Sequence, residues 1–335
     1  MKNTLIVALT ISTLMSYPSP ADEPNTISAS TATDTYPALP MPITSFGAAR
    51  VGDELYAYGG NTGDAHSYSD QGQSNQLLKL DLKNLNKGWH AVGEGPRLQG
   101  LALVAYENSV IRIGGFSALN KAGEKQRLMS MNSVAEFNVQ NNTWKELPAL
   151  PEPRSSHDAA IIDGVIYVVG GWLLRGEDET VWHSTAWQMD LRKPAPKWVA
   201  MVPPPFERRA LALSGCKGKL FVIGGMNQKG EPTTEVSTYD LNKKEWSEGP
   251  RIPGKGMDGF GAACWNLNGK LIVSNIDGKL YKLDDAGAQW TDLPNTRDAR
   301  FFHRLLPLDD HRLISIGGAN MESGKFTEPE IIEVR

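Results

Sequence analysis

The chain is poor in cysteine and has no excess of positive charge. Its 335 residues include 2 Cys, and 34 Lys and Arg stand against 38 Asp and Glu, which gives a formal net charge of -4. A protein that binds nucleic acid normally carries a basic face, so this balance argues against a nucleic-acid partner. The chain has no Cys-x-x-Cys, and its 6 His do not pair at metal-ligand spacing, so we expect no metal site.

Long apolar segments and the usual signatures of catalysis are also missing. Outside the N-terminus no run of about 18 apolar residues occurs, so we expect no membrane span once a leader has been removed. The chain contains no G-x-S-x-G elbow and no glycine loop that would cradle a phosphate. The residues therefore assign no catalytic group and no cofactor, and whether the protein is an enzyme stays open.

The N-terminal segment has the pattern of a leader followed by a linker. A short apolar run from Leu5 to Met15 follows Lys2, and Ser19-Pro20-Ala21 supplies small residues for cleavage. This pattern predicts a signal peptide over residues 1–21 and therefore a periplasmic or secreted protein. Residues 22–35 are polar and rich in Thr and Ser, and we expect a disordered linker there.

Glycine and proline, by contrast, are plentiful, and the glycines recur in pairs. The 33 Gly and 21 Pro suit many short strands joined by tight turns. Gly pairs occur at five slots, and Ser274-Asn275 fills a sixth. The slots, 43 to 56 residues apart, begin at Gly59, Gly114, Gly170, Gly224, Ser274 and Gly317. A period near 50 residues, with a short apolar run before each slot, predicts one four-stranded blade per repeat.

A second recurring pattern indicates how the blades close into a ring. After each of the first five slots, an apolar residue stands beside Asp or Asn, and a Trp follows, as at Trp144. The sixth repeat has a strand near residues 330–334, and the chain stops before any Trp. Tyr36 to Pro40 is similar in spacing to Trp144 to Pro148, so we expect the N-terminal strand to complete the last blade. The predicted fold is all-β, a six-bladed β-propeller over residues 36–335.

The segment from Pro153 to Gly171, P-R-S-S-H-D-A-A-I-I-D-G-V-I-Y-V-V-G-G, resembles the kelch repeat. With its degenerate copies the resemblance covers roughly 300 residues and implies a kelch β-propeller. This scaffold serves binding proteins as well as enzymes, so it does not select a function. Copper oxidases of the galactose-oxidase type use a Cys–Tyr crosslink and a Tyr-His pair of ligands, and this chain lacks the Tyr-His pair.

The chain also resembles the exported sialic-acid (N-acetylneuraminate) epimerases. The likeness lies in the leader, the six repeats, the length and the sequence from Pro204 to Leu241. It implies a carbohydrate isomerase in which a Glu at the Gly slot of a middle blade acts as base, with an Arg six residues on. Gly225 and Glu231 occupy those two places here, so another acid, Glu207, Glu231 or one of residues 177–179, would have to substitute.

We call the four strands of a blade a to d from the centre outward, so the d-to-a crossings and b-to-c loops share one face, where ligands usually bind. An arginine stands 16 or 17 residues before four of the slots, and an aspartate stands there in the fifth repeat. These residues are Arg97, Arg154, Arg208, Arg300 and Asp258. Four guanidinium groups around one mouth would bind a carboxylate, a sulfate or a polyhydroxylated anion. The alternative is that each arginine only braces its own blade.

Two further features leave alternatives open. Trp172, in a long b-to-c loop, could stack on the apolar face of a sugar or could hold its own loop in place. Cys216 and Cys264 each precede a b strand in neighbouring repeats, so an exported chain could join them in a disulfide or keep them as separate core residues.

The sequence therefore predicts an exported kelch propeller that binds a carbohydrate or an acidic small molecule on the face of the crossings and b-to-c loops. Two alternatives stay open. One is an isomerase of the sialic-acid mutarotase type, and the other is a platform for protein partners.

Overall fold

A computed structural model describes residues 35–294 and 298–334. The predicted signal peptide and all but the last residue of the predicted linker lie outside the described residues. The described part consists mainly of strands, with two short 3₁₀ helices at Leu85–Lys87 and Gly256–Gly259. No helix in these residues is long and apolar enough to cross a membrane.

Most strands belong to antiparallel sheets of four strands each. The first sheet contains β1 (Gly47–Val51), β2 (Glu54–Tyr58), β3 (Gln76–Asp81) and β4 (His90–Glu94). The second contains β5 (Ala102–Tyr106), β6 (Ser109–Ile113), β9 (Val134–Asn138) and β10 (Thr143–Leu147). The third contains β11 (Asp158–Ile162), β12 (Val165–Val169), β15 (Ala186–Asp190) and β16 (Trp198–Ala200).

The second half of the chain repeats this plan. The fourth sheet contains β18 (Ala212–Cys216), β19 (Lys219–Ile223), β21 (Val236–Asp240) and β22 (Glu245–Glu248). The fifth contains β23 (Ala263–Leu267), β24 (Lys270–Ser274), β25 (Leu280–Leu283) and β26 (Trp290–Leu293). The sixth contains β27 (Phe301–Pro307), β28 (Arg312–Asn320), β29 (Gly324–Lys325) and β30 (Glu330–Glu333), with β29 and β30 both paired to β28.

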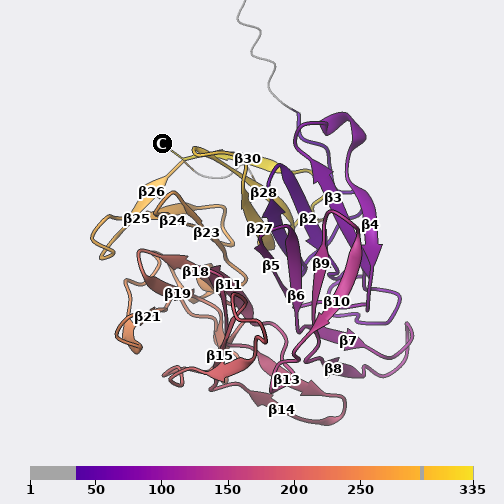
Figure 1. Cartoon of the computed structure of the whole chain (residues 1–335), viewed down its shortest axis with the longest axis horizontal. Coiled ribbons are helices and arrows are strands. Elements are labelled where there is room, and N and C mark those ends of the chain that lie inside the picture. The colour runs from indigo at the N-terminus through magenta and orange to yellow at the C-terminus, as the bar shows by residue number, and fades with distance from the viewer. Residues whose placement is uncertain (1–34, 295–297, 335) are drawn as a thin grey trace, which may run out of the picture. The chain divides into compact units, whose positions relative to one another are not determined.

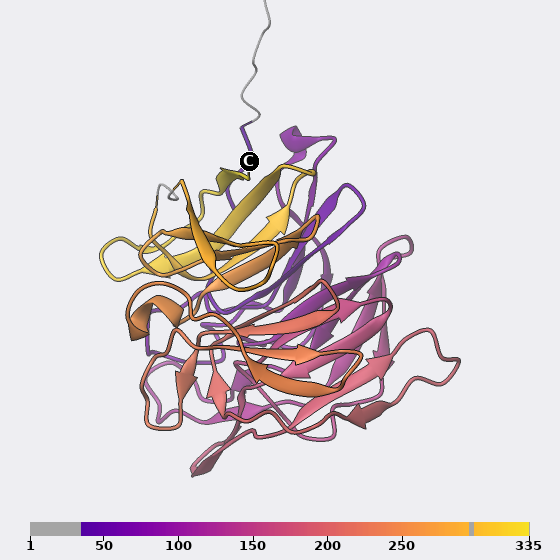
Figure 2. The same ribbon diagram turned by 90° about the vertical axis from the view of Figure 1, so that its left-hand side faces the viewer.

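The innermost strands of these sheets form a closed ring. β1 lies against β5, the neighbours then follow as β11, β18, β23 and β27, and β27 returns to β1. Figure 1 shows the sheets fanning out around this ring, and Figure 2 shows the same body turned by 90°, with strands of successive sheets stacked on one another. Buried apolar clusters fill the spaces between neighbouring sheets. The protein is therefore a β-propeller, as its repeats predict.

A tight turn joins the end of the a strand to the start of the b strand. In the third sheet Ile162 pairs with Val165, so Asp163 and Gly164 alone make the turn, with φ angles of 49° and 74°. Both angles lie in the left-handed region that a two-residue type I′ turn requires. The sequence predicts a hairpin at this dipeptide, and the structure confirms it.

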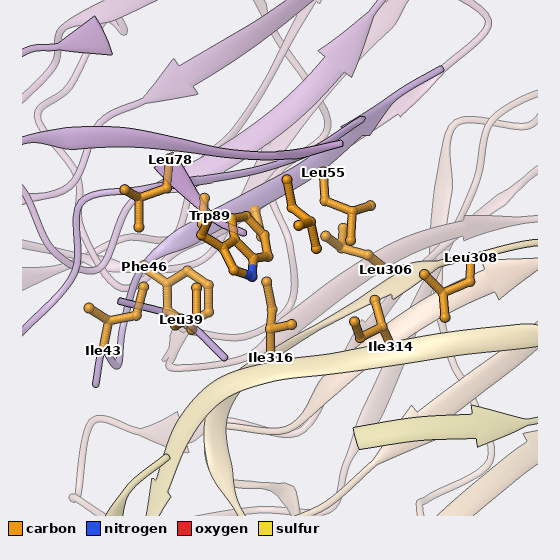
Figure 3. Close-up of a cluster of buried hydrophobic side chains, with 13 residues drawn as sticks. Leu39, Ile43, Phe46, Leu55, Leu78, Trp89, Leu306, Leu308, Ile314 and Ile316 are labelled. Carbon is orange, nitrogen blue, oxygen red and sulfur yellow. The ribbon is translucent and has the colours of Figure 1, made fainter. Parts of the chain in front are cut away.

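The seam between the first and sixth sheets is filled from both ends of the described chain. Leu39 and Ile43 are 3% and 1% exposed, and they share one buried cluster with Ile316 of β28 (Figure 3). The indole Nε1 of Trp89, just before β4 of the first sheet, donates a hydrogen bond to Pro37 O at 3.2 Å. The N-terminal segment therefore occupies the place that a d-to-a crossing occupies elsewhere in the ring.

The register of this segment differs from the predicted one. Leu39 N donates to Thr327 O at 2.9 Å, just as Leu150 N donates to Asn132 O at 2.8 Å in the second repeat. Leu39 therefore corresponds to Leu150, and the register predicted from Tyr36 is wrong by three residues. The counterpart of β10 then falls mostly on residues outside the described part.

One left-handed residue opens each a strand and links it to the next. From the second repeat on, the N–H group of each of these residues donates to the carbonyl of its counterpart in the preceding repeat, at 2.6 to 3.1 Å. The chain of hydrogen bonds runs through Ser45, Gly100, Ser156, Ala210, Gly261 and Phe302. All six residues have φ between 52° and 61°. Four of them carry a side chain, for which this conformation costs free energy, and the inter-blade hydrogen bonds offset that cost.

An ion pair crosses the axis just beyond this ring, and we call it the axial strut. Arg304 of β27 contacts Asp158 of β11 through Nη1 and Oδ1 at 3.1 Å. The same guanidinium donates to Phe46 O at 2.9 Å and to Leu101 O at 3.3 Å, while Asp158 Oδ2 accepts from Leu213 N at 3.0 Å. The strut therefore ties five of the six sheets together at the centre.

Truncating Leu39 tests the seam. Leu39→Ala should lower the free energy of unfolding by about 2–4 kcal/mol, because it leaves a cavity between the first and sixth sheets. Deleting residues 34–42 should lower the Tm further. Leu119→Ala is the control, because Leu119 is 48% exposed. Urea unfolding that shows equal losses for Leu39→Ala and Leu119→Ala would contradict the account of the seam.

The strut is tested by Asp158→Asn. The change removes one charge of a largely buried pair, so we expect a loss of about 2–4 kcal/mol in the free energy of unfolding. Asp190→Asn breaks an exposed pair with Arg192 at 2.8 Å and should cost less than about 1 kcal/mol. Thermal and urea unfolding compare the two variants. A smaller loss for Asp158→Asn than for Asp190→Asn would refute a stabilising strut.

Candidate functional site

Three of the four predicted site arginines are buried in their own sheets. Arg154, Arg208 and Arg300 are 0%, 2% and 2% exposed. Each guanidinium donates to the first carbonyl of its own glycine slot, Gly170, Gly224 or Gly317, at 2.9 to 3.1 Å. Each also donates to a carbonyl just before the c strand, Thr185, Glu235 or Glu328, at 2.8 to 3.3 Å. These contacts match the bracing role, in which each of the three arginines holds the strands of its own blade together.

Arg97 does not belong to the same series. It is exposed, and its Nη1 donates to Gln73 O at 2.6 Å. The place equivalent to Arg154 is held by buried Leu98, because Leu98 O accepts from Gly60 N at 2.8 Å just as Arg154 O accepts from Gly115 N at 2.9 Å. Arg97 stands 17 residues before Gly114 and Leu98 stands 16 before it, so the predicted spacing fits both residues. In the structure Leu98 occupies the position.

The other predicted groups also have local roles. Asp258 lies in the 3₁₀ helix Gly256–Gly259, and its Oδ2 accepts from Lys255 N at 2.6 Å. Gly225 has a φ of 99°, and a Cβ added there would lie 2.6 Å from Arg209 O, so no larger side chain fits. Glu231 is exposed and accepts from Asn227 Nδ2 at 3.0 Å. The implied epimerase base and arginine therefore have no counterparts at these two positions.

The loops predicted between β6 and β9 and between β12 and β15 are strands that pair with each other. They contribute β7 (Phe116–Ala118), β8 (Leu128–Ser130), β13 (Trp172–Arg175) and β14 (Asp178–Trp182), in the sheet order β14-β13-β8-β7. Figure 1 shows these hairpins beside one another. The side chain of Gln73 fixes the sheet to the first repeat through two hydrogen bonds to the backbone of Ala118, at 2.9 and 3.1 Å. This face therefore presents a braced platform rather than free loops.

Arg209 lies on this face and is not among the residues that the repeat pattern predicts for a site. It follows Arg208 in the short strand β17 (Arg208–Arg209), which pairs with β20 (Met226–Asn227). Successive side chains of a strand point to opposite sides, so Arg208 enters its own sheet while Arg209 points away from it. Its guanidinium lies over the ring of Trp172 at 4.0 Å and near the ring of Trp182 at 5.6 Å. In the sequence, the dipeptide Arg208-Arg209 is the feature that could have indicated a second arginine with a different orientation.

Aromatic rings from three repeats gather around this guanidinium. The rings of Trp172 and Trp182 meet edge to face at 5.5 Å, and those of Tyr68 and Phe116 meet edge to face at 5.8 Å. The charge of Arg209 acts on the Tyr68 phenol, whose pKa burial raises and Arg209 lowers. We call Arg209, Trp172, Trp182, Tyr68 and Phe116 the arginine–aromatic cluster. It contains Trp172, the one predicted site residue that the structure places there.

The charge of Arg209 is poorly compensated. Burial lowers the pKa of its guanidinium, and the nearby Tyr68 phenol opposes that shift. Its hydrogen bond goes to the sulfur of Met226 at 3.1 Å, and no carboxylate of the described residues lies within ion-pair distance. Arg209 Nε and Trp172 Nε1 are both buried without a hydrogen-bond partner in the described residues. A partly desolvated cation without an anion costs free energy, which an anionic ligand would recover.

A groove of about 510 Å³ runs beside β17 and β20. It is lined by Ser184, Pro204 to Glu207, and Asn227 to Lys229. One carboxylate oxygen of Glu207 is buried and has no hydrogen-bond partner in the described residues. Of the three substitutes named for the epimerase base, Glu207 alone lies next to the strand that carries Arg209.

No metal centre or disulfide emerges in the described part of the chain. Groups of three His, Cys, Asp or Glu side chains that could hold an ion are absent from the searched residues. Both cysteines are free, and Cys216 Sγ donates to Gly269 O at 3.3 Å. The structure thus has Cys216 and Cys264 as separate thiols, the second of the two alternatives left open.

Comparison with known proteins shows that this chain is similar to kelch-repeat proteins. A family model described as Kelch motif matches residues 207–253. The N-acetylneuraminate epimerase of Haemophilus influenzae (strain PittEE) is 26% identical over 291 residues, which cover 74% of this chain and 73% of that protein. Kelch-like protein 35 of Mus musculus is 24% identical over 218 residues, 65% of this chain, which spans only 32% of that protein. The solved structure of YjhT superposes with a TM-score of 0.70 at 17% identity and covers 89% of this chain and 97% of its own.

Buried histidines give the fold a predictable response to acid. Burial lowers the pKa of His303 to about 3, with added repulsion from Arg300 and Arg304, and lowers that of His183 to about 4, with repulsion from Arg154. An unfolded imidazole has a pKa near 6.5, so below about pH 6.5 the unfolded chain binds more protons than the folded one. Stability is therefore present above about pH 6.5 and is lost progressively as the pH falls toward these folded values.

The expected result is a falling Tm between about pH 6.5 and about pH 4, with a shallower fall for His303→Leu. His90→Gln, at an exposed position, is the matched control and should follow the wild type. Scanning calorimetry at a series of pH values makes the measurement. An unchanged slope in His303→Leu would show that His303 does not contribute.

Proposed function

Because the chain is a kelch-repeat propeller that resembles N-acetylneuraminate epimerase, we propose that it binds an acidic sugar at the arginine–aromatic cluster. N-acetylneuraminate is the first candidate, and the periplasm or the exterior of the cell is the proposed location. The observation that carries the proposal is the half-buried guanidinium of Arg209, which lacks a carboxylate partner among the described residues and is stacked on Trp172.

The chemistry of the cluster matches the two halves of such a ligand. The carboxylate of the sugar would accept charge-assisted hydrogen bonds from Arg209, and these are roughly twice as strong as neutral ones. The apolar face of the sugar ring would stack on an indole, where it is buried while its hydroxyl groups stay in water. Arg209 stacks on an indole already, which fixes its orientation before a ligand arrives. The braced sheet that carries Trp172 and Trp182 supports the same preorganisation.

A second candidate function, an isomerase that exchanges the anomers of the bound sugar, is supported by the relative named N-acetylneuraminate epimerase and by Glu207. Anomer exchange needs a base that removes the proton of the anomeric hydroxyl and an acid that protonates the ring oxygen. Glu207 stands two residues before Arg209 and has a carboxylate oxygen without a partner in the described residues. It is the side chain that we propose as the base in this case.

Titration calorimetry with N-acetylneuraminate tests the binding site. Arg209→Gln should weaken binding by about tenfold or more, because it removes the charge that meets the carboxylate. Arg251→Gln is the matched control, since Arg251 is exposed and paired with Glu235 at 2.7 Å. Neutral N-acetylmannosamine should bind more weakly than N-acetylneuraminate to the wild type. Equal affinities for Arg209→Gln and Arg251→Gln would place the ligand elsewhere.

Anomer exchange, followed by NMR, separates the two candidates. If the protein is an isomerase, Glu207→Gln should slow the exchange by about 100-fold or more while leaving calorimetric binding nearly unchanged. A wild type that binds N-acetylneuraminate without accelerating the exchange removes the isomerase and leaves the binding protein. An unchanged rate in Glu207→Gln would remove Glu207 from the role of base.

A further inference from the structure

The axial channel is a second cavity, distinct from the arginine–aromatic cluster. Its volume is about 390 Å³, and its walls come from the inner strands of all six sheets. It extends from Asp158 and Arg304, near the start of the a strands, to Arg50 and Asn266, near their ends. The a strands end at the a-to-b hairpins, so the channel lies on the hairpin side of the axial strut. The cluster lies on the opposite side, where the b-to-c loops emerge.

Small side chains form part of the channel walls, beside larger ones such as Leu103, Ile161 and Trp265. Ala48, Ala49, Ala105, Ala159, Ala160 and Ser214 line it, so the bore is left open where larger residues would fill it. Each inner strand pairs with a neighbour in its own sheet on one side only. The walls therefore combine apolar side chains with the polar backbone edges of the inner strands, and the volume lies within the range of small-molecule sites.

At the inner end of the channel, the guanidinium of Arg304 has N–H donors that make no hydrogen bond among the described residues. A guanidinium has five N–H donors, and Arg304 directs one bond each to Phe46 O, Asp158 and Leu101 O. Its side chain is 26% exposed, and it lines the cavity. The charged side chains that line the channel are Arg50, Arg304 and Asp158; Asp158 is paired with Arg304 at 3.1 Å, and Asp53, outside the lining, lies 3.7 Å from Arg50. The feature that would bind an anion is therefore the pair of unused N–H donors of Arg304.

We propose that the axial channel binds a short straight-chain monocarboxylate. Its carboxylate would accept the remaining N–H donors of Arg304, and its alkyl chain would lie along the alanine wall. The proposal does not depend on the acidic-sugar site, because the two sites share no residue and lie on opposite sides of the strut.

Cys264 provides a reporter inside the channel. Cys264 is one of the residues that line the cavity. The chain has one other cysteine, Cys216, which is buried in the fourth sheet. In a Cys216→Ser protein, alkylation by iodoacetamide would report on Cys264 alone. Burial raises the pKa of the Cys264 thiol, so the reaction is followed at alkaline pH.

Butyrate should slow this alkylation, and butyramide, a neutral molecule of the same size, should not. With butyrate at ten times its Kd the rate should fall by about tenfold, because only the free protein reacts. Equal protection by the two compounds, or no protection by butyrate up to the highest usable concentration, would overturn the proposal.

Three variants locate the effect. Arg304→Lys keeps the positive charge but loses the forked donors, so protection should weaken severalfold, and Ala105→Leu narrows the bore and should also reduce it. Arg209→Gln changes the other face and should leave protection unchanged. If Arg304→Lys does not fold, Ala105→Leu still decides the matter. Full protection by butyrate in Ala105→Leu, or its loss in Arg209→Gln, would contradict a ligand in the channel.

Discussion

The ion pair between Arg304 and Asp158 is the constraint on which the centre of this propeller depends. Each inner strand has a free edge toward the axis, where unpaired N–H and C=O groups cost free energy if water cannot satisfy them. The strut satisfies such groups from Phe46, Leu101 and Leu213, which belong to three different repeats. It therefore fixes the positions of most inner strands at once and separates the loop face from the axial channel.

One amino-acid type has two different roles within a single dipeptide. Arg208 closes its own blade by binding carbonyl groups, and its charge is spread over backbone dipoles. Arg209 has no such partners in the described residues and stacks on Trp172 instead. The guanidinium of Arg208 meets two carbonyl groups and the Ser237 hydroxyl, whereas that of Arg209 has no carboxylate partner among the described residues and is the better candidate to meet an anion. We therefore base the proposed function on Arg209 and not on the arginines that recur with the repeat.

The repeat pattern predicts the architecture because each blade is a local unit. A glycine slot, a two-residue turn such as Asp163-Gly164 and a tryptophan are all encoded within about 50 residues. The register at the N-terminus could not be predicted as well, because the short proline-rich segment around Leu39 offers few side chains to align. The sheet formed by β7, β8, β13 and β14 was missed for a related reason, since it pairs strands from two different repeats.

Alignment of the repeats contains a pattern that indicates the contact across the axis. Asp158 and Arg304 stand at the same place in the third and sixth repeats, where the other repeats carry Gly47, Ala102, Ala212 and Ala263. Opposite charges at a position otherwise held by small residues, in blades half a ring apart, indicate a contact across the centre. Arg209 could be separated from Arg208 only once the register of β17 was known.

The central claim about function is that a carboxylate ligand meets Arg209 on the loop face. A crystal structure of the protein soaked with N-acetylneuraminate tests it most directly. The account predicts electron density for the sugar with its carboxylate in hydrogen-bonding distance of the Arg209 guanidinium and its ring against Trp172 or Trp182. Density for the sugar at Arg97 or on the hairpin face, with the arginine–aromatic cluster empty, would contradict it.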